Sequence, residues 1–450
     1  MKSMVAWLGL GLLLIAVSGF CLAVSPAEAQ PRTTKGGGDT PTLTRLPSDP
    51  LIGGELPGGG LPGGPPGGQP NNNAPHAPDL IVAVFRPGTP DQTPTDFAES
   101  LNLTIERRYT LSGLGLRVFL LRIPAGADFD ATLRQANADG RPVWVQPDFS
   151  YQSLGDDNGS VSKQQYALAR IHAESLPQAA RGQGVTVAMI DSGVARGHES
   201  LVQGKLTLVD VVDEKDTPPP ETHGTAIASI IVGSGKVKGL APAAELLAIR
   251  AFAEVDPKTG ASTSDSFHVS QGISFALDRK ARVINMSIGG PNDPLVRMAI
   301  EQAVLTGVIV VAAAGNQGPD APPVYPAAQR GVIAVTATDD KDRLFSGANQ
   351  GDYIAVAAPG VAVIAAKPGR DKGASAYDYF TGTSMATGYV TGLAAVLLSA
   401  DPKLTSADIR RIMEASATDL GAPQKDPEFG WGRIDAAAAL SATPTIGAAN

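Results

Sequence analysis

The sequence predicts an α/β protein with a doubly wound, mostly parallel sheet, preceded by a small α+β domain. Three observations support this prediction. Short apolar strands alternate with helices between residues 163 and 440. These strands are nearly continuous apolar runs, as expected when helices cover both faces of a sheet. In contrast, residues 79–151 follow a β-α-β-β-α-β order in about 70 residues.

Composition and charge exclude several classes of protein. The 450 residues are 18% charged and 43% hydrophobic, with a formal net charge of -8. An acidic balance argues against nucleic acid or an anionic membrane as the main partner. Cys21 is the only cysteine, so a disulfide framework is excluded. The five histidines contain no His-x-x-x-His pair, and we expect no metal site from these residues.

The first 29 residues have the layout of a secretory signal peptide. Lys2 precedes an apolar stretch over residues 4–24, and Ala27-Glu28-Ala29 follows it. Cleavage after Ala29 predicts a secreted or periplasmic protein. An uncleaved membrane anchor is the alternative, because the apolar stretch is almost long enough to span a bilayer. No later segment suits a transmembrane helix, so we expect no stable span in the mature chain.

Residues 30–78 are predicted to be a disordered linker. They are rich in Gly and Pro, and such a segment buries too little apolar surface to offset its ordering entropy. Residues 441–450 are expected to form a short tail.

The small domain covers residues 79–151. Its order of elements is the ferredoxin-like arrangement, which by itself implies no function. Strands are predicted at 80–85, 104–109, 116–123 and 142–146, and helices at 94–101 and 128–137.

The large domain covers residues 163–440. Strands are predicted at 185–190, 246–251, 283–288, 308–314, 332–337 and 353–357, and helices at 224–233, 266–280, 293–306, 384–399 and 405–416. Thr405 and Asp408 form a variant of the capping box at the last helix. Residues 254–265 read as a surface loop. In such sheets ligands bind beyond the carboxyl ends of the strands, so the residues that follow each strand are examined first.

Two of these positions suit proton transfer. Asp191 directly follows the strand 185–190, where a carboxylate can be held rigidly against an imidazole. His223 begins the helix near residue 224, and histidine is well matched to moving a proton near neutral pH. Each residue also has an ordinary structural interpretation: Asp191 can be a polar residue at a strand exit, and His223 can be a helix cap. His198 is a rival base, but it lies in a polar turn and is interpreted as structural.

Two further positions suit acyl transfer. Asn316 follows the strand 308–314, and its amide N–H is a suitable donor to an oxyanion, although Asn after Gly is also common in turns. Ser384 follows Gly382 at the start of an apolar helix, where the helix dipole favours a nucleophile facing a cleft. An N-cap serine is the alternative.

The order of these residues along the chain separates the known triads. Asp191, His223 and Ser384 occur as Asp, His, Ser, whereas α/β-hydrolases have Ser, acid, His and chymotrypsin-like enzymes have His, Asp, Ser. The chain resembles the subtilisin-like serine peptidases (subtilases) in this order and in six sequence runs. These runs are Val187-Ala188-Met189-Ile190-Asp191-Ser192-Gly193, His223-Gly224-Thr225-Ala226, Val283-Ile284-Asn285-Met286-Ser287-Ile288-Gly289, Ala313-Ala314-Gly315-Asn316, Gly382-Thr383-Ser384-Met385-Ala386 and Gly430-Trp431-Gly432-Arg433-Ile434-Asp435.

The resemblance implies a secreted serine endopeptidase acting on polypeptides through Ser384, His223 and Asp191, with Asn316 at the oxyanion. It implies that residues 79–151 are an inhibitor-type propeptide of a self-processed zymogen, cut somewhere in 150–163. It assigns substrate binding to Ser287, Ile288 and Gly289 as a pairing strand, and to Ala313, Ala314 and Gly315 as a pocket wall. Calcium is common in the family, but no run of carboxylates here specifies a site.

The sequence departs from the family pattern at one position, and two alternative functions remain open. Gly388 stands inside the helix after Ser384, where the family usually has proline. A non-catalytic pseudoprotease or binding scaffold on the same fold is the main alternative, although such a role would not require all four polar residues. A lipase or esterase is disfavoured by the triad order and by the absence of Gly-x-Ser-x-Gly.

Overall fold

The computed structural model describes residues 74–154, 165–202, 204–212, 221–252, 254–255, 262–369 and 376–443. The predicted signal peptide, most of the linker and most of the tail lie outside these residues. By internal contacts the chain divides into Met1–Pro50 and Leu51–Asn450, and every described residue belongs to the second unit.

A parallel sheet forms the centre of the molecule, in the order β14-β13-β12-β10-β5-β7-β6. Its strands are β5 (Thr186–Asp191), β6 (Lys205–Asp210), β7 (Glu245–Arg250), β10 (Val283–Met286), β12 (Ile309–Ala313), β13 (Val332–Thr338) and β14 (Ile354–Pro359). All neighbouring strands are parallel. The predicted α/β fold with a parallel sheet is therefore confirmed.

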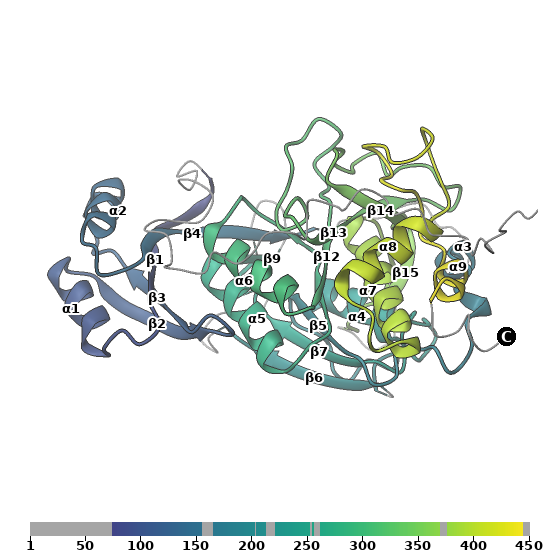
Figure 1. The fold of residues 1–450 in the computed structure, drawn as a ribbon, viewed down its shortest axis with the longest axis horizontal. Helices are drawn as coiled ribbons and strands as arrows, with labels where there is room; N and C mark the ends of the chain where they lie inside the picture. Colours follow the sequence, from purple (N-terminus) through teal and green to yellow (C-terminus); the bar gives the residue numbers. More distant parts are fainter. Residues whose placement is uncertain are drawn as a thin grey trace, which may run out of the picture. The chain divides into compact units, whose positions relative to one another are not determined.

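Helices cover both faces of this sheet (Figure 1). The pair α4 (Thr222–Val232) and α7 (Thr383–Ala400) packs in one hydrophobic cluster, and α5 (Ser266–Asp278) and α6 (Pro294–Leu305) pack in another. Among the described helices, α7 meets the length and hydropathy of a membrane span, contrary to the expectation from sequence. However, 89% of its apolar window is buried inside the fold, as in a core helix.

Shorter elements complete the edges of the molecule. They are α3 (Tyr166–Arg170), η1 (Ala173–Ser175), α8 (Ser406–Ser416), α9 (Ala436–Ser441) and the hairpin of β15 (Val363–Ala366) with β16 (Tyr377–Phe380). The capping box at α8 is confirmed, because Thr405 and Asp408 bond reciprocally to each other's backbone N–H.

An N-terminal lobe, defined here as residues 74–154, precedes these elements, and the other described residues, from 165 onward, form the large lobe. The lobe contains β1 (His76–Phe85), α1 (Gln92–Ser100), β2 (Thr104–Leu111), β3 (Leu116–Arg122), α2 (Phe129–Ala138) and β4 (Trp144–Ser153). Its antiparallel strands lie in the order β2-β3-β1-β4. Helices α1 and α2 contribute to a small core of the lobe's own that includes Phe85, Phe97 and Leu133.

The opposite face of this sheet packs against the large lobe. Val82, Val84 and Trp144 belong to the same hydrophobic cluster as Phe267 and Ile273 of α5. Polar contacts surround this apolar contact. Thus one layer, made by α5 and α6, lies between two sheets.

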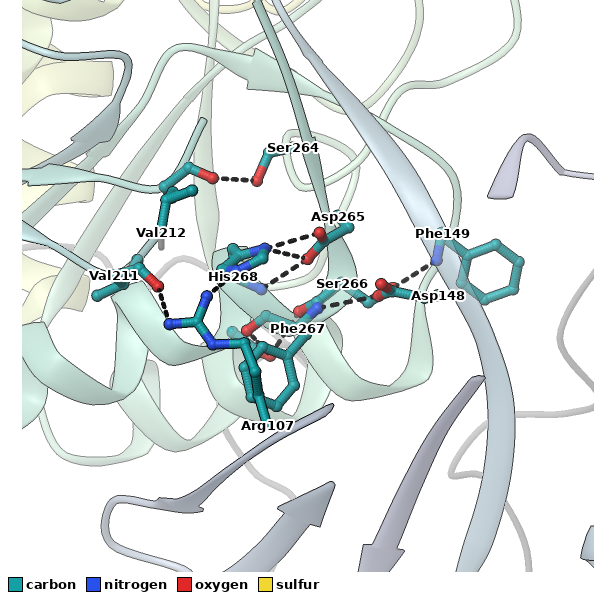
Figure 2. A network of polar contacts seen from close by, with 12 residues as sticks. Arg107, Asp148, Phe149, Val211, Val212, Ser264, Asp265, Ser266, Phe267 and His268 are labelled. Atoms are coloured by element: carbon teal, nitrogen blue, oxygen red, sulfur yellow. Dashed lines mark hydrogen bonds and ion pairs between the residues drawn. The ribbon is translucent and has the colours of Figure 1, made fainter. Parts of the chain in front are cut away.

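Figure 2 shows one such polar network at the start of α5. A nitrogen of the Arg107 guanidinium, from β2, lies 2.6 Å from Nε2 of His268. Nδ1 of His268 lies 2.7 Å from Oδ2 of Asp265. Asp148 of β4 accepts a hydrogen bond from the backbone N–H of Phe267 at 3.2 Å. The N-terminal lobe thereby supplies a carboxylate to the first turn of α5, where the helix dipole favours negative charge.

Strand β4 is longer than predicted and joins the two lobes. Residues 142–146 were the expected strand, but β4 continues to Ser153 and enters the large lobe. There it pairs antiparallel with β9 (Ser262–Asp265) on one edge and with β11 (Ile288–Gly289) on the other. The prediction of a surface loop over 254–265 is therefore wrong for its last part, since β9 is a paired strand. β8 (Glu254–Val255) pairs with β9 in turn.

Candidate active site

Three neighbouring strands of the parallel sheet end at the same edge with polar residues. β12, β10 and β5 lie side by side. Asp191 is the last residue of β5, Ser287 follows β10, and Asn316 comes three residues after β12. Because parallel strands present their carboxyl ends together, these residues gather at the edge where ligands bind in open α/β sheets.

Asp191 and His223 form a direct pair. Nδ1 of His223 lies 2.7 Å from Oδ1 of Asp191, whose side chain is fully buried. Asp191 also accepts a hydrogen bond from the N–H of Ser192. A carboxylate at Nδ1 fixes the ring orientation and directs Nε2 to the task of proton transfer.

The turn after Asp191 is tied to the helix that carries His223. Ser192 Oγ accepts a hydrogen bond from the N–H of Gly224 at 3.0 Å. A Cβ on Gly224 would lie 2.5 Å from the carbonyl oxygen of Gly193, so only glycine permits this approach. The glycine after His223 is therefore a packing requirement of the pair.

Ser384 lies in the first turn of α7, next to the strand exit of β10. Its Oγ donates to the carbonyl oxygen of Ser287 at 3.3 Å, and Oγ of Ser287 donates back to the carbonyl of Ser384 at 3.3 Å. The preceding Gly382 has φ of 150°, a conformation that L side chains rarely adopt. The backbone conformation directly before the helix start at Ser384 therefore favours glycine.

Asn316 is oriented by Thr383, a residue that the sequence analysis did not single out. The side-chain oxygen of Asn316 accepts hydrogen bonds from the N–H of Thr383 at 3.0 Å and from its hydroxyl at 2.8 Å. With Oδ1 held in this way, the amide N–H₂ points away from Thr383. In the sequence, the position of Thr383 directly before Ser384 is the signal that could have indicated its role in orienting Asn316.

The predicted substrate-binding residues lie at two strand ends. Ile288 and Gly289 form β11 and pair with Ser153 and Gln152 of β4. Ala313, Ala314 and Gly315 are buried at the end of β12. The hydroxyl of Tyr353 donates to the carbonyl of Ala314 at 2.7 Å.

His198 is placed apart from this pair, in a hydrogen-bonded turn. Its Nδ1 accepts from the N–H of Ser200, and its Nε2 lies 2.7 Å from the carbonyl oxygen of Ala376. Both ring nitrogens therefore have structural partners.

Gly388 marks a close approach between the two helices that carry Ser384 and His223. A Cβ at this position would lie 2.9 Å from Cγ2 of Ile230 in α4. The departure from the family pattern is accounted for by packing: α4 and α7 are close enough here that glycine is required.

Within the described ranges, no group of three or more His, Cys, Asp or Glu side chains is arranged to hold a metal ion.

Comparison with known proteins gives a consistent result. The model of the subtilase family matches residues 182–432. Subtilisin E of Bacillus subtilis is 35% identical over 268 residues, which cover 57% of this chain and 66% of subtilisin E. Thermitase of Thermoactinomyces vulgaris is 35% identical over 265 residues, covering 58% of this chain and 90% of thermitase.

A solved structure shows the same fold. The crystal structure of fervidolysin from Fervidobacterium pennivorans, described as a keratinolytic enzyme related to subtilisin, has a TM-score of 0.68 and 24% identity. The match covers 82% of this chain and 62% of fervidolysin.

Fold, site and relatives define the class of serine-type endopeptidases. The chain belongs to the subtilase family, since the family model matches more than half of it.

Proposed function

We propose that this chain is a secreted serine endopeptidase that is made as a zymogen and processes itself. The observation that carries the catalytic part is the 2.7 Å contact between Asp191 and His223 at the strand edge that also holds Ser384 and Asn316. Secretion rests on the signal-peptide pattern of residues 1–29.

The proposed reaction is acyl transfer from a peptide to water. His223 accepts the proton of Ser384 as Oγ attacks the peptide carbonyl carbon, and Asp191 stabilises the resulting imidazolium. The carbonyl oxygen becomes negative and receives hydrogen bonds from the Asn316 side chain and the Ser384 backbone N–H. His223 then protonates the leaving amine. Water repeats the sequence on the acyl-enzyme and frees Ser384.

The N-terminal lobe is proposed to be a ferredoxin-like, inhibitor-type propeptide whose last residues occupy the cleft. The N–H of Leu154 donates to the carbonyl oxygen of Ser287 at 3.1 Å. The hydroxyl of Ser384 donates to the same oxygen. A Cβ on Gly289 would lie 2.9 Å from a methyl group of Leu154, so this side chain is packed against the substrate strand. These contacts support the proposal that Leu154 is the residue whose carbonyl is attacked.

If Leu154 is the attacked residue, the processing site within the range 150–163 is a single bond. We assign the cleavage to the bond between Leu154 and Gly155, the latter lying outside the described residues. Pairing of β4 on both edges keeps the segment extended, which is the conformation that strand-like substrate recognition requires.

The test is self-processing of the full chain. Wild-type protein is expected to give a mature product whose N-terminus is Gly155 by mass spectrometry. Ser384→Ala should remain joined at this bond and lose about 10⁶-fold in peptide turnover, the size of the loss for the nucleophile in subtilisin. Processing of the Ser384→Ala chain in purified form would refute the peptidase and favour a binding scaffold.

A further inference from the structure

A buried tyrosine lies three residues before the proposed cleavage position. The side chain of Tyr151 in β4 is only 1% exposed, although the strand enters the cleft from another lobe. Its hydroxyl donates to Oδ2 of Asp293 at 3.2 Å. Tyr151 pairs with Ser264 of β9. A substrate that follows the same path would place its fourth residue before the cleaved bond at this point.

The pocket around this ring is built by the large lobe. A Cβ on Gly290 would lie 2.5 Å from Cδ1 of Tyr151, so the absent side chain makes room for the ring. Ile288, Leu295 and Val296 belong to the same hydrophobic cluster. The pocket therefore has apolar walls and one acid, Asp293, which is 2% exposed.

The hydrogen bonds of Asp293 show what changes when the N-terminal lobe leaves. Oδ1 accepts from the N–H groups of Leu295 and Val296, as the N-cap of α6. Oδ1 also accepts from Gln146, while Oδ2 accepts from Ser266 and Tyr151. The two donors from β4 depart with the lobe, whereas the others stay. Burial raises the pKa of Asp293, and the departing donors are among the groups that satisfy its oxygens.

We propose, on the basis of the function proposed above, that Asp293 is a specificity-determining residue for tyrosine. The substrates selected are peptides with tyrosine at the fourth position before the cleaved bond and an aliphatic residue such as leucine next to that bond. The hydroxyl of a substrate tyrosine replaces the hydrogen-bond donor that Oδ2 of Asp293 loses when the N-terminal lobe leaves. Phenylalanine fills the same walls but leaves a buried carboxylate oxygen one donor short, which costs binding free energy.

The first experiment needs no variant. The self-processed full chain is given three internally quenched peptides that share Gln-Ser-Leu before the cleaved bond and differ in the preceding residue: tyrosine, phenylalanine or O-methyltyrosine. We expect kcat/KM for the tyrosine peptide to exceed the other two by about tenfold, because only its oxygen donates to a carboxylate. Equal rates for tyrosine and phenylalanine would overturn the proposal.

Two variants separate the hydroxyl from the ring. Asp293→Ser keeps a side-chain oxygen for the N-cap of α6 and removes Oδ2, so the tyrosine-to-phenylalanine ratio should fall to about one. Gly290→Ala crowds the ring, so both rates should fall together while the ratio stays near tenfold. Each ratio is measured within one enzyme and does not depend on how much of it is active.

An unchanged ratio in Asp293→Ser would also overturn the proposal. Failure of the peptidase function has a different signature: no peptide is cleaved by the wild type, or Ser384→Ala cleaves them equally well. If all three peptides are cleaved at one rate by wild type alone, the specificity inference fails and the function stands.

Discussion

The two sheets of this molecule are buried in different ways. The parallel sheet of the large lobe has its own helices on both faces, α4 and α7 on one and α5 and α6 on the other. The sheet of the N-terminal lobe has α1 and α2 on one face only, and its other face packs in the cluster of α5. The large lobe thus completes its own core, whereas the N-terminal lobe depends on docking to bury its second face.

The two lobes therefore contribute different parts of the candidate site. The proposed catalytic groups lie at the edge of the sheet that has helices of its own lobe on both faces, so we expect their positions not to require the N-terminal lobe. The cleft, in contrast, is filled by a strand that belongs to the dependent sheet. Substitutions in the site, between the helices and at the docking surface should therefore affect different measurements.

The largest expected effect separates chemistry from docking. Asn316→Ala removes one oxyanion donor and should lower kcat by about 10²–10³-fold, the loss found for the corresponding kind of donor in subtilisin. Because the described hydrogen bonds of the Asn316 side chain are to Thr383 of the large lobe, inhibition of the processed enzyme by the N-terminal lobe should be unchanged. Active-site-titrated turnover and inhibition assays check both. Loss of docking in this variant would show that the site and the lobe are coupled.

An intermediate effect tests the independence of the large lobe's core. Gly388→Ala forces a methyl group against Ile230 and should destabilise the protein by about 1–3 kcal/mol. It should also lower kcat by about tenfold, because α4 carries His223 and α7 carries Ser384, and their spacing has changed.

Gly392→Ala is the matched control for that variant. It lies in the same helix, and its Cβ would lie 2.8 Å from Leu240, which is outside α4. Thermal denaturation should show a similar loss of stability with kcat preserved. Equal losses of turnover in both variants would contradict a specific role for the spacing of α4 and α7.

The smallest effect concerns docking alone and depends on pH. Asp148 is fully buried in the docked lobe, and burial raises its pKa well above the ordinary value, with Asp265 and Asp293 adding to the shift. The carboxyl group of Asp148 therefore binds its proton more tightly in the docked state than in the free lobe. Docking is strongest at pH values below the ordinary pKa of an aspartate side chain and weakens as pH rises through the raised pKa of Asp148.

Asp148→Asn removes the buried charge and keeps an oxygen for the N–H of Phe267. Inhibition by the lobe should become a few-fold tighter at neutral pH and less dependent on pH, with kcat unchanged. Asp293 has a raised pKa as well and remains in the variant, so a part of the pH dependence persists. If inhibition by the lobe depended on pH as steeply in Asp148→Asn as in the wild type, Asp148 would be ruled out as the source of that dependence.

The sequence predicted those parts of the fold that local pattern determines. Strand β12 is apolar throughout and β13 nearly so, and helix α7 carries no charged residue and is buried over most of its length, so their existence follows from short segments. The edge strand β6 was missed because Lys205–Asp210 alternates between polar and apolar residues. β9 was missed because it is short and is defined by its pairing with β4. β11, in contrast, lies within the pairing strand that the family resemblance implied for Ser287, Ile288 and Gly289.

The candidate site could likewise be predicted from the sequence only in part. Asp191, His223, Asn316 and Ser384 could be proposed because each stands at a strand exit or a helix start. Their orientation could not be predicted, since it depends on groups such as Thr383 and Ser192. The contact between Tyr151 and Asp293 joins positions 142 residues apart and has no local signal.

The continuity of β4 has a consequence for timing. Hydrolysis of the bond after Leu154 would break none of the hydrogen bonds that β4 makes with β1, β9 and β11. Processing and activation are then two events with separate rates, the first set by chemistry and the second by dissociation of the whole lobe. A newly processed molecule would stay inhibited for the lifetime of that docking. The delay before activation would therefore be governed by the whole docking interface, including contacts of β4 with β1 and β9 that cleavage leaves intact.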